Sequence, residues 1–170
     1  MAQNGVVNLE PIYAAFFALL AAAPNWTDPY SGNATGFSLI SRVPRDLTQL
    51  VGGQLPALFQ EELGFEIVPA VQDFQARSTY KLRVDVAVVL PCFGAKQVPG
   101  TETNIPSQGL NLAITSVLTA ITPASPNAKQ TLGGLVNSVV CSGRVERVNG
   151  LPGAGSQLSV GVIPFTILTM

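Results

Sequence analysis

Carboxylates and thiols are the residue types in this sequence best suited to chemistry. The chain has no histidine, which is the commonest general base and metal ligand. Ser-His, Cys-His and His-metal sites are therefore excluded within the chain. The one carboxylate cluster is Glu61-Glu62 with Glu66.

An acid pair for glycoside hydrolysis must face the same bond from two sides. Adjacent carboxylates on a strand point to opposite faces instead, and the residues around Glu61 favour a strand. An enzyme that uses Glu61, Glu62 or Asp85 is the weakest of the hypotheses considered. No catalytic residue, cofactor site or metal site is predicted, and no binding residue is assigned.

The glycine-rich stretch from Gly150 to Gly155 resembles a phosphate-binding loop in composition alone. No Lys-Ser or Lys-Thr follows it, and it opens no predicted helix, so it lacks the groups that hold phosphate. A hairpin turn is the better interpretation.

The two cysteines, Cys92 and Cys141, each follow apolar or prolyl residues. A disulfide between them is one interpretation. Reduced, half-buried thiols are the other, and it is preferred because a domain of this size needs no disulfide. The sequence does not determine whether the two lie close together.

Charge is scarce in this chain. Charged residues make up 11% of it, against about 25% in an ordinary protein. Two interpretations follow: other subunits cover much of the surface, or the protein is a polar, nearly neutral monomer. The first is favoured because interface cores are depleted in charge. The nine basic residues are scattered and the net charge is −1, which argues against a grip on nucleic-acid phosphates. DNA passing nearby without being held is not excluded.

The N-terminus raises the question of targeting. Pro11–Ala23 is apolar, and its three final alanines resemble a signal-peptidase site. No basic residue precedes it, while Glu10 does, and thirteen residues are too few to span a bilayer. With a signal, Asn25 and Asn33 would become glycosylation sequons. We interpret them as chance matches in a cytosolic protein with no membrane association.

Hydrophobic periodicity places the helices. Residues 1–8 are expected to be flexible, with Asn8 as N-cap of a helix over Ile12–Ala23 whose first turn contains Pro11. Its apolar face comprises Ile12, Phe16, Leu19, Leu20 and Ala23, flanked by Tyr13 and Phe17. A second helix is expected after Ser107, ending before Pro123, with a stripe of Leu110, Ala113, Ile114, Val117, Leu118 and Ile121.

Strands are predicted between the helices and after them. Phe37–Arg42 is a short strand, Leu55–Val68 is mainly strand, and Thr79–Leu90 alternates most clearly, with Lys81, Arg83 and Asp85 on its polar face. Asn25–Gly36, Val43–Leu55 and Phe93–Pro106 are expected to be loops or irregular. Residues 130–170 are expected to form an antiparallel hairpin, with a turn or bulge at Gly133-Gly134 and a second turn from Asn149-Gly150 to Gly155. Pro164 is expected at an edge or bulge.

These elements predict an α+β fold. Two main helices would pack on one face of a mostly antiparallel sheet that ends in the C-terminal hairpin. A single domain over residues 1–170 accommodates all of them.

Several segments, in order, resemble bacteriophage tail terminator proteins, the ring proteins at the head-proximal end of the tail. The most specific is Leu132-Gly133-Gly134-Leu135-Val136. The others are Arg42, Gln54–Phe59, Glu61-Glu62, Tyr80–Val84, Leu110-Asn111, the strand to Arg144, and Val162–Leu168. The resemblance covers roughly residues 37–170, and the first thirty-six residues and the Phe93–Pro106 loop fall outside it.

The resemblance implies a structural virion protein of the tail and neck, assembled in the host cytoplasm. Such proteins form a ring, commonly a hexamer, on the last ring of the tail tube, where they stop polymerisation. They present a surface to neck or head-completion proteins, and genome DNA passes through the lumen without specific binding. Contacts to a sheath are a further expectation. The family's α+β fold agrees with the fold predicted from periodicity.

Two other functions stay open. One is another neck, head–tail connector or tail-completion protein, or a tube-like subunit. The other, of a different class, is a secreted glycosylated binding module from which residues 1–23 are removed.

Overall fold

The computed structural model describes residues 8–29, 31–68, 79–91, 108–125, 127–153 and 157–169. Its helices are α1 (Glu10–Ala21) and α2 (Gln108–Ile121), with short 3-10 turns η1 (Leu47–Gln49) and η2 (Gly52–Gln54). Its strands are β1 (Trp26–Thr27), β2 (Ala34–Thr35), β3 (Leu39–Ser41), β4 (Ala57–Val68), β5 (Thr79–Pro91), β6 (Val136–Cys141), β7 (Glu146–Pro152) and β8 (Gln157–Thr169).

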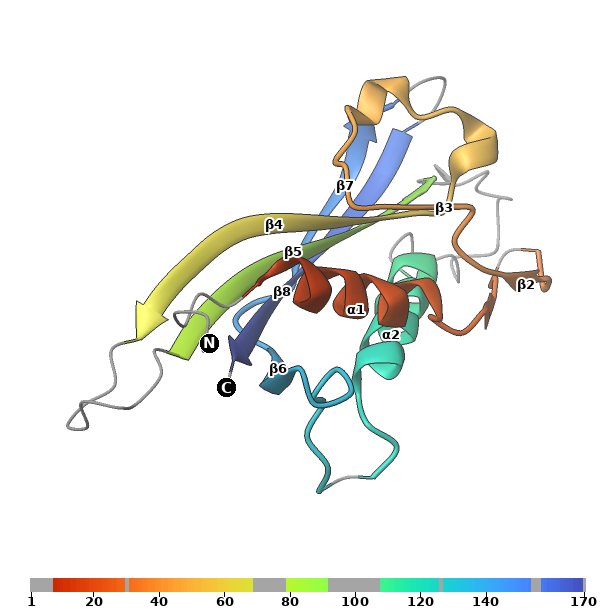
Figure 1. Cartoon of the computed structure of the whole chain (residues 1–170). Coiled ribbons are helices and arrows are strands. Elements are labelled where there is room, and N and C mark those ends of the chain that lie inside the picture. The colour runs from red at the N-terminus through yellow and green to blue at the C-terminus, as the bar shows by residue number, and fades with distance from the viewer. Residues whose placement is uncertain are drawn as a thin grey trace, which may run out of the picture.

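Six of the strands form one curved sheet (Figure 1). The order is β3-β4-β5-β8, and both β6 and β7 pair with the far side of β8. Only β3 and β4 run parallel; the other pairs are antiparallel. The predicted α+β fold with a mostly antiparallel sheet is confirmed.

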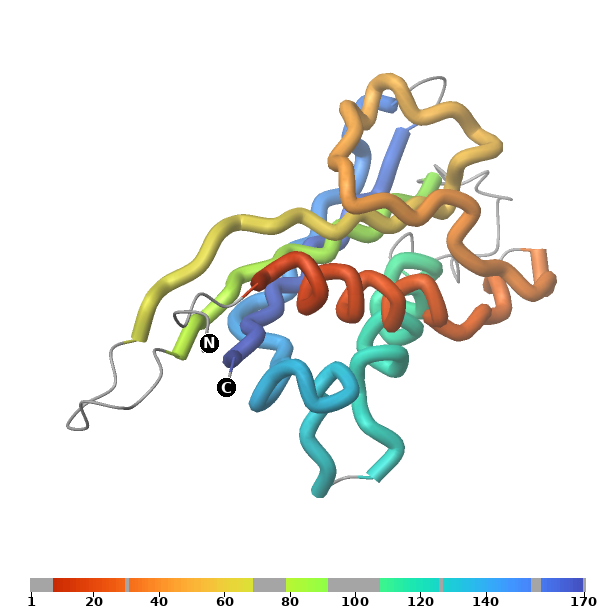
Figure 2. The backbone as a smooth tube through the Cα atoms, viewed as in Figure 1, coloured from red at the N-terminus to blue at the C-terminus, as the bar shows by residue number. Residues whose placement is uncertain are grey.

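Both helices lie on the same face of the sheet, as predicted (Figures 1 and 2). The prediction of Asn8 as N-cap was wrong by one residue: Leu9 is the N-cap of α1, with no side-chain capping hydrogen bond. The Asn8 side chain still accepts a hydrogen bond from the Glu10 amide at 3.2 Å. Helix α1 ends at Ala21, before Pro24. Its buried side chains are Ile12, Tyr13, Phe16 and Leu20, so Tyr13 belongs to the buried face and does not merely flank it.

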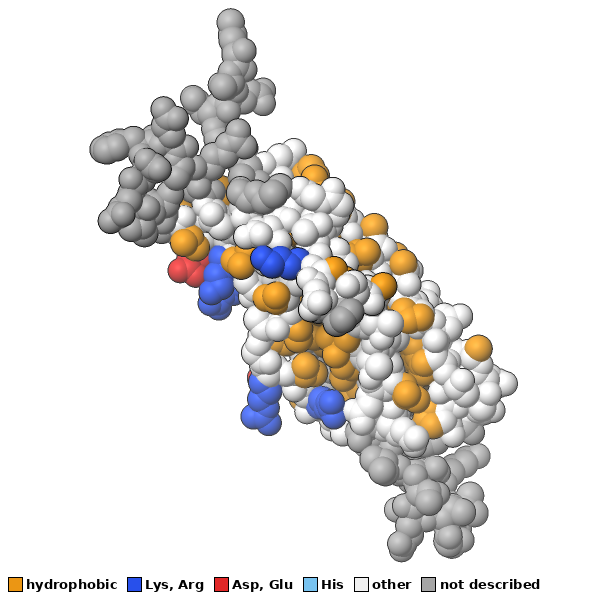
Figure 3. Space-filling view, turned by 90° about the horizontal axis from the view of Figure 1, so that it is seen from below, with side chains coloured by type: hydrophobic (Ala, Val, Ile, Leu, Met, Phe, Trp, Pro, Cys, Tyr) orange, Lys and Arg blue, Asp and Glu red, His pale blue; other side chains and the backbone are white. Residues whose placement is uncertain are grey.

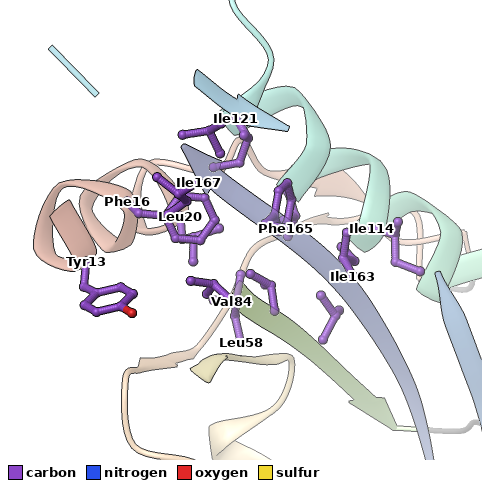
Figure 4. Close-up of a cluster of buried hydrophobic side chains, with 14 of the residues drawn as sticks. Tyr13, Phe16, Leu20, Leu58, Val84, Ile114, Ile121, Ile163, Phe165 and Ile167 are labelled. Atoms are coloured by element: carbon purple, nitrogen blue, oxygen red, sulfur yellow. The ribbon is translucent and has the colours of Figure 1, made fainter. Parts of the chain in front are cut away.

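The main core lies between the helices and the sheet (Figure 4). Phe16 of α1 meets Phe165 of β8 edge to face, with ring centroids 5.3 Å apart. Ile114 and Ile121 of α2 belong to the same core. The predicted α2 stripe is buried except for Leu118, which is half-buried. From β5, the core receives alternate residues: Leu82, Val84, Val86, Val88 and Leu90.

The opposite face of the sheet has a smaller core at one end. Leu50, Phe59, Val89 and Leu158 are buried there. They pack beneath the segment that contains η1 and η2. At the start of η1, the Asp46 side chain caps the turn by accepting a hydrogen bond from the Thr48 amide at 2.9 Å. The segment predicted to be irregular therefore covers that end of the second face of the sheet.

The loop predicted over Asn25–Gly36 contains a small hairpin. Strands β1 and β2 pair antiparallel, and the buried Trp26 ring packs against Phe37 with centroids 5.0 Å apart. Strand pairs this short leave little periodicity in a sequence, which is why the segment was predicted as a loop.

The C-terminal hairpin contains one strand more than predicted. Strand β8 pairs with β7 along its first half and with β6 along its second half. Asn149-Gly150 was predicted as a turn but lies within β7, at a register shift between Val148 and Leu151. A bulge tolerates Asn and Gly as a turn does, so this dipeptide alone did not distinguish them.

The prediction for Pro164 was wrong about the edge, because β8 lies between β5 and the β6–β7 pair. Its carbonyl accepts a hydrogen bond from the Ser142 amide at 2.9 Å, so the prolyl nitrogen faces the same side. That side is where β6 has ended and β7 has not begun. A missing donor is tolerated at such a break in the ladder.

Some expectations lie outside the described residues. These are the Phe93–Pro106 loop, the Ser107 cap, the flexible residues before Asn8, and Cys92 with any partnership to Cys141.

The predicted turn at Gly133-Gly134 is confirmed, with φ values of 70° and 91°. A Gly134→Val variant is expected to lose stability by about 1–3 kcal/mol, because a β-branched residue is strained at positive φ. The melting temperature should fall by roughly 2–10 °C, with lower solubility. Gly53→Ala is the matched control, because Gly53 has no positive φ and no atom near its added methyl group. Equal melting temperatures for Gly134→Val and wild type would contradict the constraint.

Candidate functional site

Exposed apolar side chains gather on the second half of β4. We call Glu61–Val68 the β4 arm; every residue in it is exposed. Phe65 and Ile67 are 52% and 56% exposed, and Leu63 and Val68 are exposed with them. Clusters of exposed apolar side chains mark contact sites more often than single ones do.

The arm projects because β4 and β5 extend beyond the part of the sheet that the helices cover. In Figure 1, β4 and β5 continue past α1 and curve away from the body of the molecule. The register between β4 and β5 shifts between Glu62 and Gly64, where Gly64 has φ of 112°. A bulge of this kind bends a strand and redirects its side chains. Along the arm, Phe65 packs against Tyr80 of β5, with ring centroids 5.7 Å apart.

Arg42 forms ion pairs at the start of the β4 arm, around Glu62, which we call the root of the arm. Arg42 donates hydrogen bonds to both carboxylate oxygens of Glu10 at the start of α1, and to Glu62 on β4 at 2.6 Å. The two carboxylates raise the pKa of Arg42 above its already high ordinary value. The Arg42 hydrogen bond in turn lowers the pKa of Glu10 below its usual 4.5.

Buried Gln60 adds hydrogen bonds at the root of the arm. Its side chain is buried, and its amide nitrogen donates to the Tyr13 carbonyl at 3.3 Å and to Glu62 at 3.2 Å. The arm therefore starts where hydrogen bonds join α1, β4 and Arg42, the residue after β3.

Glu61 and Glu62, adjacent at the root of the arm, point to opposite faces of the sheet, as strand geometry predicts. Glu62 lies on the helix side with Arg42, whereas Glu61 lies on the other face, opposite Asp85 of β5. Burial first, and then the charges of Glu61 and Glu146, raise the pKa of Asp85. The Glu61–Asp85 proximity depends on strand register, so no pattern in the sequence indicated it.

A groove of about 480 Å³ lies on the face of the sheet opposite the helices. It is lined by Lys81, Arg83 and Asp85 together with Leu63 of the arm and Thr166 of β8. The predicted polar face of β5 is confirmed by these three charged residues. The groove runs from the arm toward the break between β6 and β7, where Ser142 and Gly143 line it.

A second, more apolar hollow of about 360 Å³ lies near the N-terminus of α2. Trp26, Leu55, Leu90 and Leu110 line it, along with Ser159, whose buried hydroxyl has no hydrogen-bond partner among the described residues. Residues 92–107, outside the described part, connect Pro91 on its rim to α2. We assign no ligand to this hollow.

Side chains for chemistry do not converge elsewhere in the described residues. No three His, Cys, Asp or Glu side chains there are placed to hold a metal ion. Cys141 is exposed, and partial burial raises the pKa of its thiol. No helix in the described ranges is long and apolar enough to cross a membrane.

The first three residues of the glycine-rich stretch, Gly150–Pro152, belong to β7 and open no helix, and Ala154 and Gly155 lie outside the described residues. Comparison of the sequence with family models and with curated proteins finds no match.

The ion pair between Arg42 and Glu10 predicts that the thermal stability of the protein depends on pH. Because the pKa of Glu10 is lowered in the folded chain, the stabilisation by Arg42 is fully present above about pH 4.5 and is lost as the pH falls through the lowered pKa. An Arg42→Gln variant should melt at a lower temperature than wild type at pH 7, and the gap should narrow toward pH 3.

Thermal melting at steps between pH 3 and pH 7 measures this gap. Arg45→Gln is the matched control, since Arg45 is an exposed arginine on the same connection. A gap for Arg42→Gln that is as wide at pH 3 as at pH 7 would show that the ion pairs do not stabilise the fold.

Proposed function

We propose that this chain is a structural subunit of a bacteriophage tail, the terminator that forms a ring on the head-proximal end of the tail tube. The β4 arm is the observation that carries the proposal. An edge strand with exposed Phe65 and Ile67 is a liability in an isolated monomer. In a ring, a neighbouring subunit covers such a surface.

Composition and resemblance support the same function. Charged residues at 11% of the chain suit a subunit whose flanks are covered by copies of itself. The resemblance of residues 37–170 to tail terminators includes Arg42 and Glu62, which form the root of the arm. A rotated, repeated contact closes into a ring.

The ring, commonly a hexamer in this family, would stop tube polymerisation. One of its faces would meet the tail tube protein and the other the neck or head-completion proteins, with a sheath as a further partner in contractile tails. Genome DNA would pass through the lumen without specific binding. The protein would act in the virion after assembly in the host cytoplasm.

The fold weighs against the secreted module. Removing residues 1–23 would delete α1, whose Phe16 and Leu20 are fully buried in the main core. Loss of one large core side chain costs about 2–5 kcal/mol, and α1 contributes four buried side chains. A chain that begins at Pro24 would not retain this fold.

Deletion of the gene from the phage or prophage that encodes it tests the proposal. We expect overlong tails in electron micrographs, because nothing then stops tube growth. Tails of normal length without heads would instead indicate another neck or tail-completion protein and overturn the assignment. Expression of the wild-type chain from a plasmid should restore normal length.

Complementation also tests the arm. A Phe65→Ser/Ile67→Ser chain should fold, because both side chains are more than half exposed, yet should leave tails overlong. Val51→Ser is the matched control: Val51 is 57% exposed but lies in the segment around η2, away from the arm. Normal tail length with the double variant would show that the arm is not a contact surface.

A further inference from the structure

The two edges of the sheet differ in charge. The β4 arm carries Glu61, Glu62 and Glu66 and no basic residue. From Gln108 to Thr169 the charged residues are Lys129, Arg144, Glu146 and Arg147, so this part of the chain has a net charge of +2 from three basic residues and one acid. All four are exposed. Glu62 is ion-paired with Arg42, and Glu66 lies opposite Lys81 of β5. The charges on strand β4 itself are therefore acidic, and those along the other edge are mainly basic.

Both edges also expose backbone and apolar side chains. Beyond Phe59, β4 has β5 as its one strand neighbour in the described chain, because β3 pairs only with Ala57–Phe59. On the other edge, the outer side of β6 has one bridge, between Gln130 and Val139. Strand β7 pairs with β8 alone among the described strands. Leu135, Val140 and Val148 are exposed along that edge.

We call the second surface the β6–β7 edge: Lys129, Leu135, Val140, Arg144, Arg147 and Val148. Figure 3 shows the molecule from below, where apolar side chains (orange) are exposed and some Lys and Arg side chains (blue) lie near them. Strand geometry gives the arm a length of roughly 25 Å, and the β8 segment paired with β6 and β7, Gln157–Thr169, a length of roughly 40 Å. Both surfaces expose apolar side chains, and their strands differ in the sign of their charges.

We propose that the β4 arm of one copy docks against the β6–β7 edge of the next copy, head to tail. This inference rests on the proposed function for its partner, a second copy of the chain. Like charges oppose the alternatives, since two arms would bring Glu61 and Glu66 of both copies together and two β6–β7 edges six basic residues. A contact between two different surfaces of one chain is heterologous and propagates around a ring.

Docking would also bury the exposed apolar side chains of the arm and pair its backbone edge. Phe65 and Ile67 would be buried against apolar side chains of the neighbour, while the charges at the rim set orientation and register. The free backbone edge of β4 offers hydrogen-bond donors and acceptors to an added strand.

Reciprocal charge reversal tests the contact. Glu61→Lys/Glu66→Lys reverses the arm, and Arg144→Glu/Arg147→Glu reverses the edge. Sedimentation velocity of purified chains should show association of wild type, and each variant alone should associate roughly tenfold or more weakly. An equimolar mixture should recover association, because each reversed arm then meets a reversed edge and each native arm a native edge. The mixture closes rings with an even number of subunits.

Arg45→Glu is the control and should associate like wild type. Glu61→Gln/Glu66→Gln serves if a reversed variant fails to fold, and should weaken association to a smaller degree. Variants that associate as wild type does, or a mixture that fails to recover, would overturn the proposal. So would wild type that stays monomeric at about 1 mM, where even weak contacts form. If the β6–β7 edge instead bound an acidic partner protein, its reversal would leave self-association unchanged.

The readout is independent of tail length. Association of purified chains can fail in this test while gene deletion still yields overlong tails. It can equally succeed while deletion leaves tail length normal. The two proposals are therefore distinguishable.

Discussion

The pairing of β5 with β8 is the interaction on which the rest of the structure depends. It joins eleven residue pairs, from Lys81 with Leu168 to Pro91 with Leu158. Strands β4, β6 and β7 each pair directly with one of these two strands, and β3 attaches through β4. Alternate residues of the pair supply the core under the helices and, at one end, the smaller core on the opposite face.

That central ladder explains why the sheet has two open edges. Among the described strands, β4 beyond Phe59 forms one edge and β6 with β7 forms the other, and the helices cover one face near the middle. The β4 arm continues where helix cover has ended, so its apolar side chains stay exposed in a single copy. Native proteins protect such edges with charges and bulges, and the arm has both, in its glutamates and in the bulge before Gly64. These devices oppose pairing between two arms and leave a basic partner favourable.

Local patterns predicted the elements well where a pattern ran for several turns or pleats. Helices α1 and α2 and strand β5 lie close to their predicted positions because each has ten or more residues with a steady period. The predicted strand over Leu55–Val68 is confirmed as β4. Prediction failed at Asn149-Gly150 and Pro164, where local residue preferences suit several structures. At both positions the local structure depends on the pairing of β8, whose partner changes from β7 to β6 partway along the strand.

The sequence by itself determined the α+β class, the scarcity of charge and the absence of histidine chemistry. Composition is a property of the chain alone, and periodicity depends only on residues that are close in the sequence. Tertiary structure alone decided which distant residues meet. Arg42 joins Glu10 and Glu62, which are 32 and 20 residues away, and Glu61 faces Asp85. It also decided that three glutamates lie on one edge and three basic residues on the other. Strand order and register fix these meetings, and both arise from the packing of the whole chain.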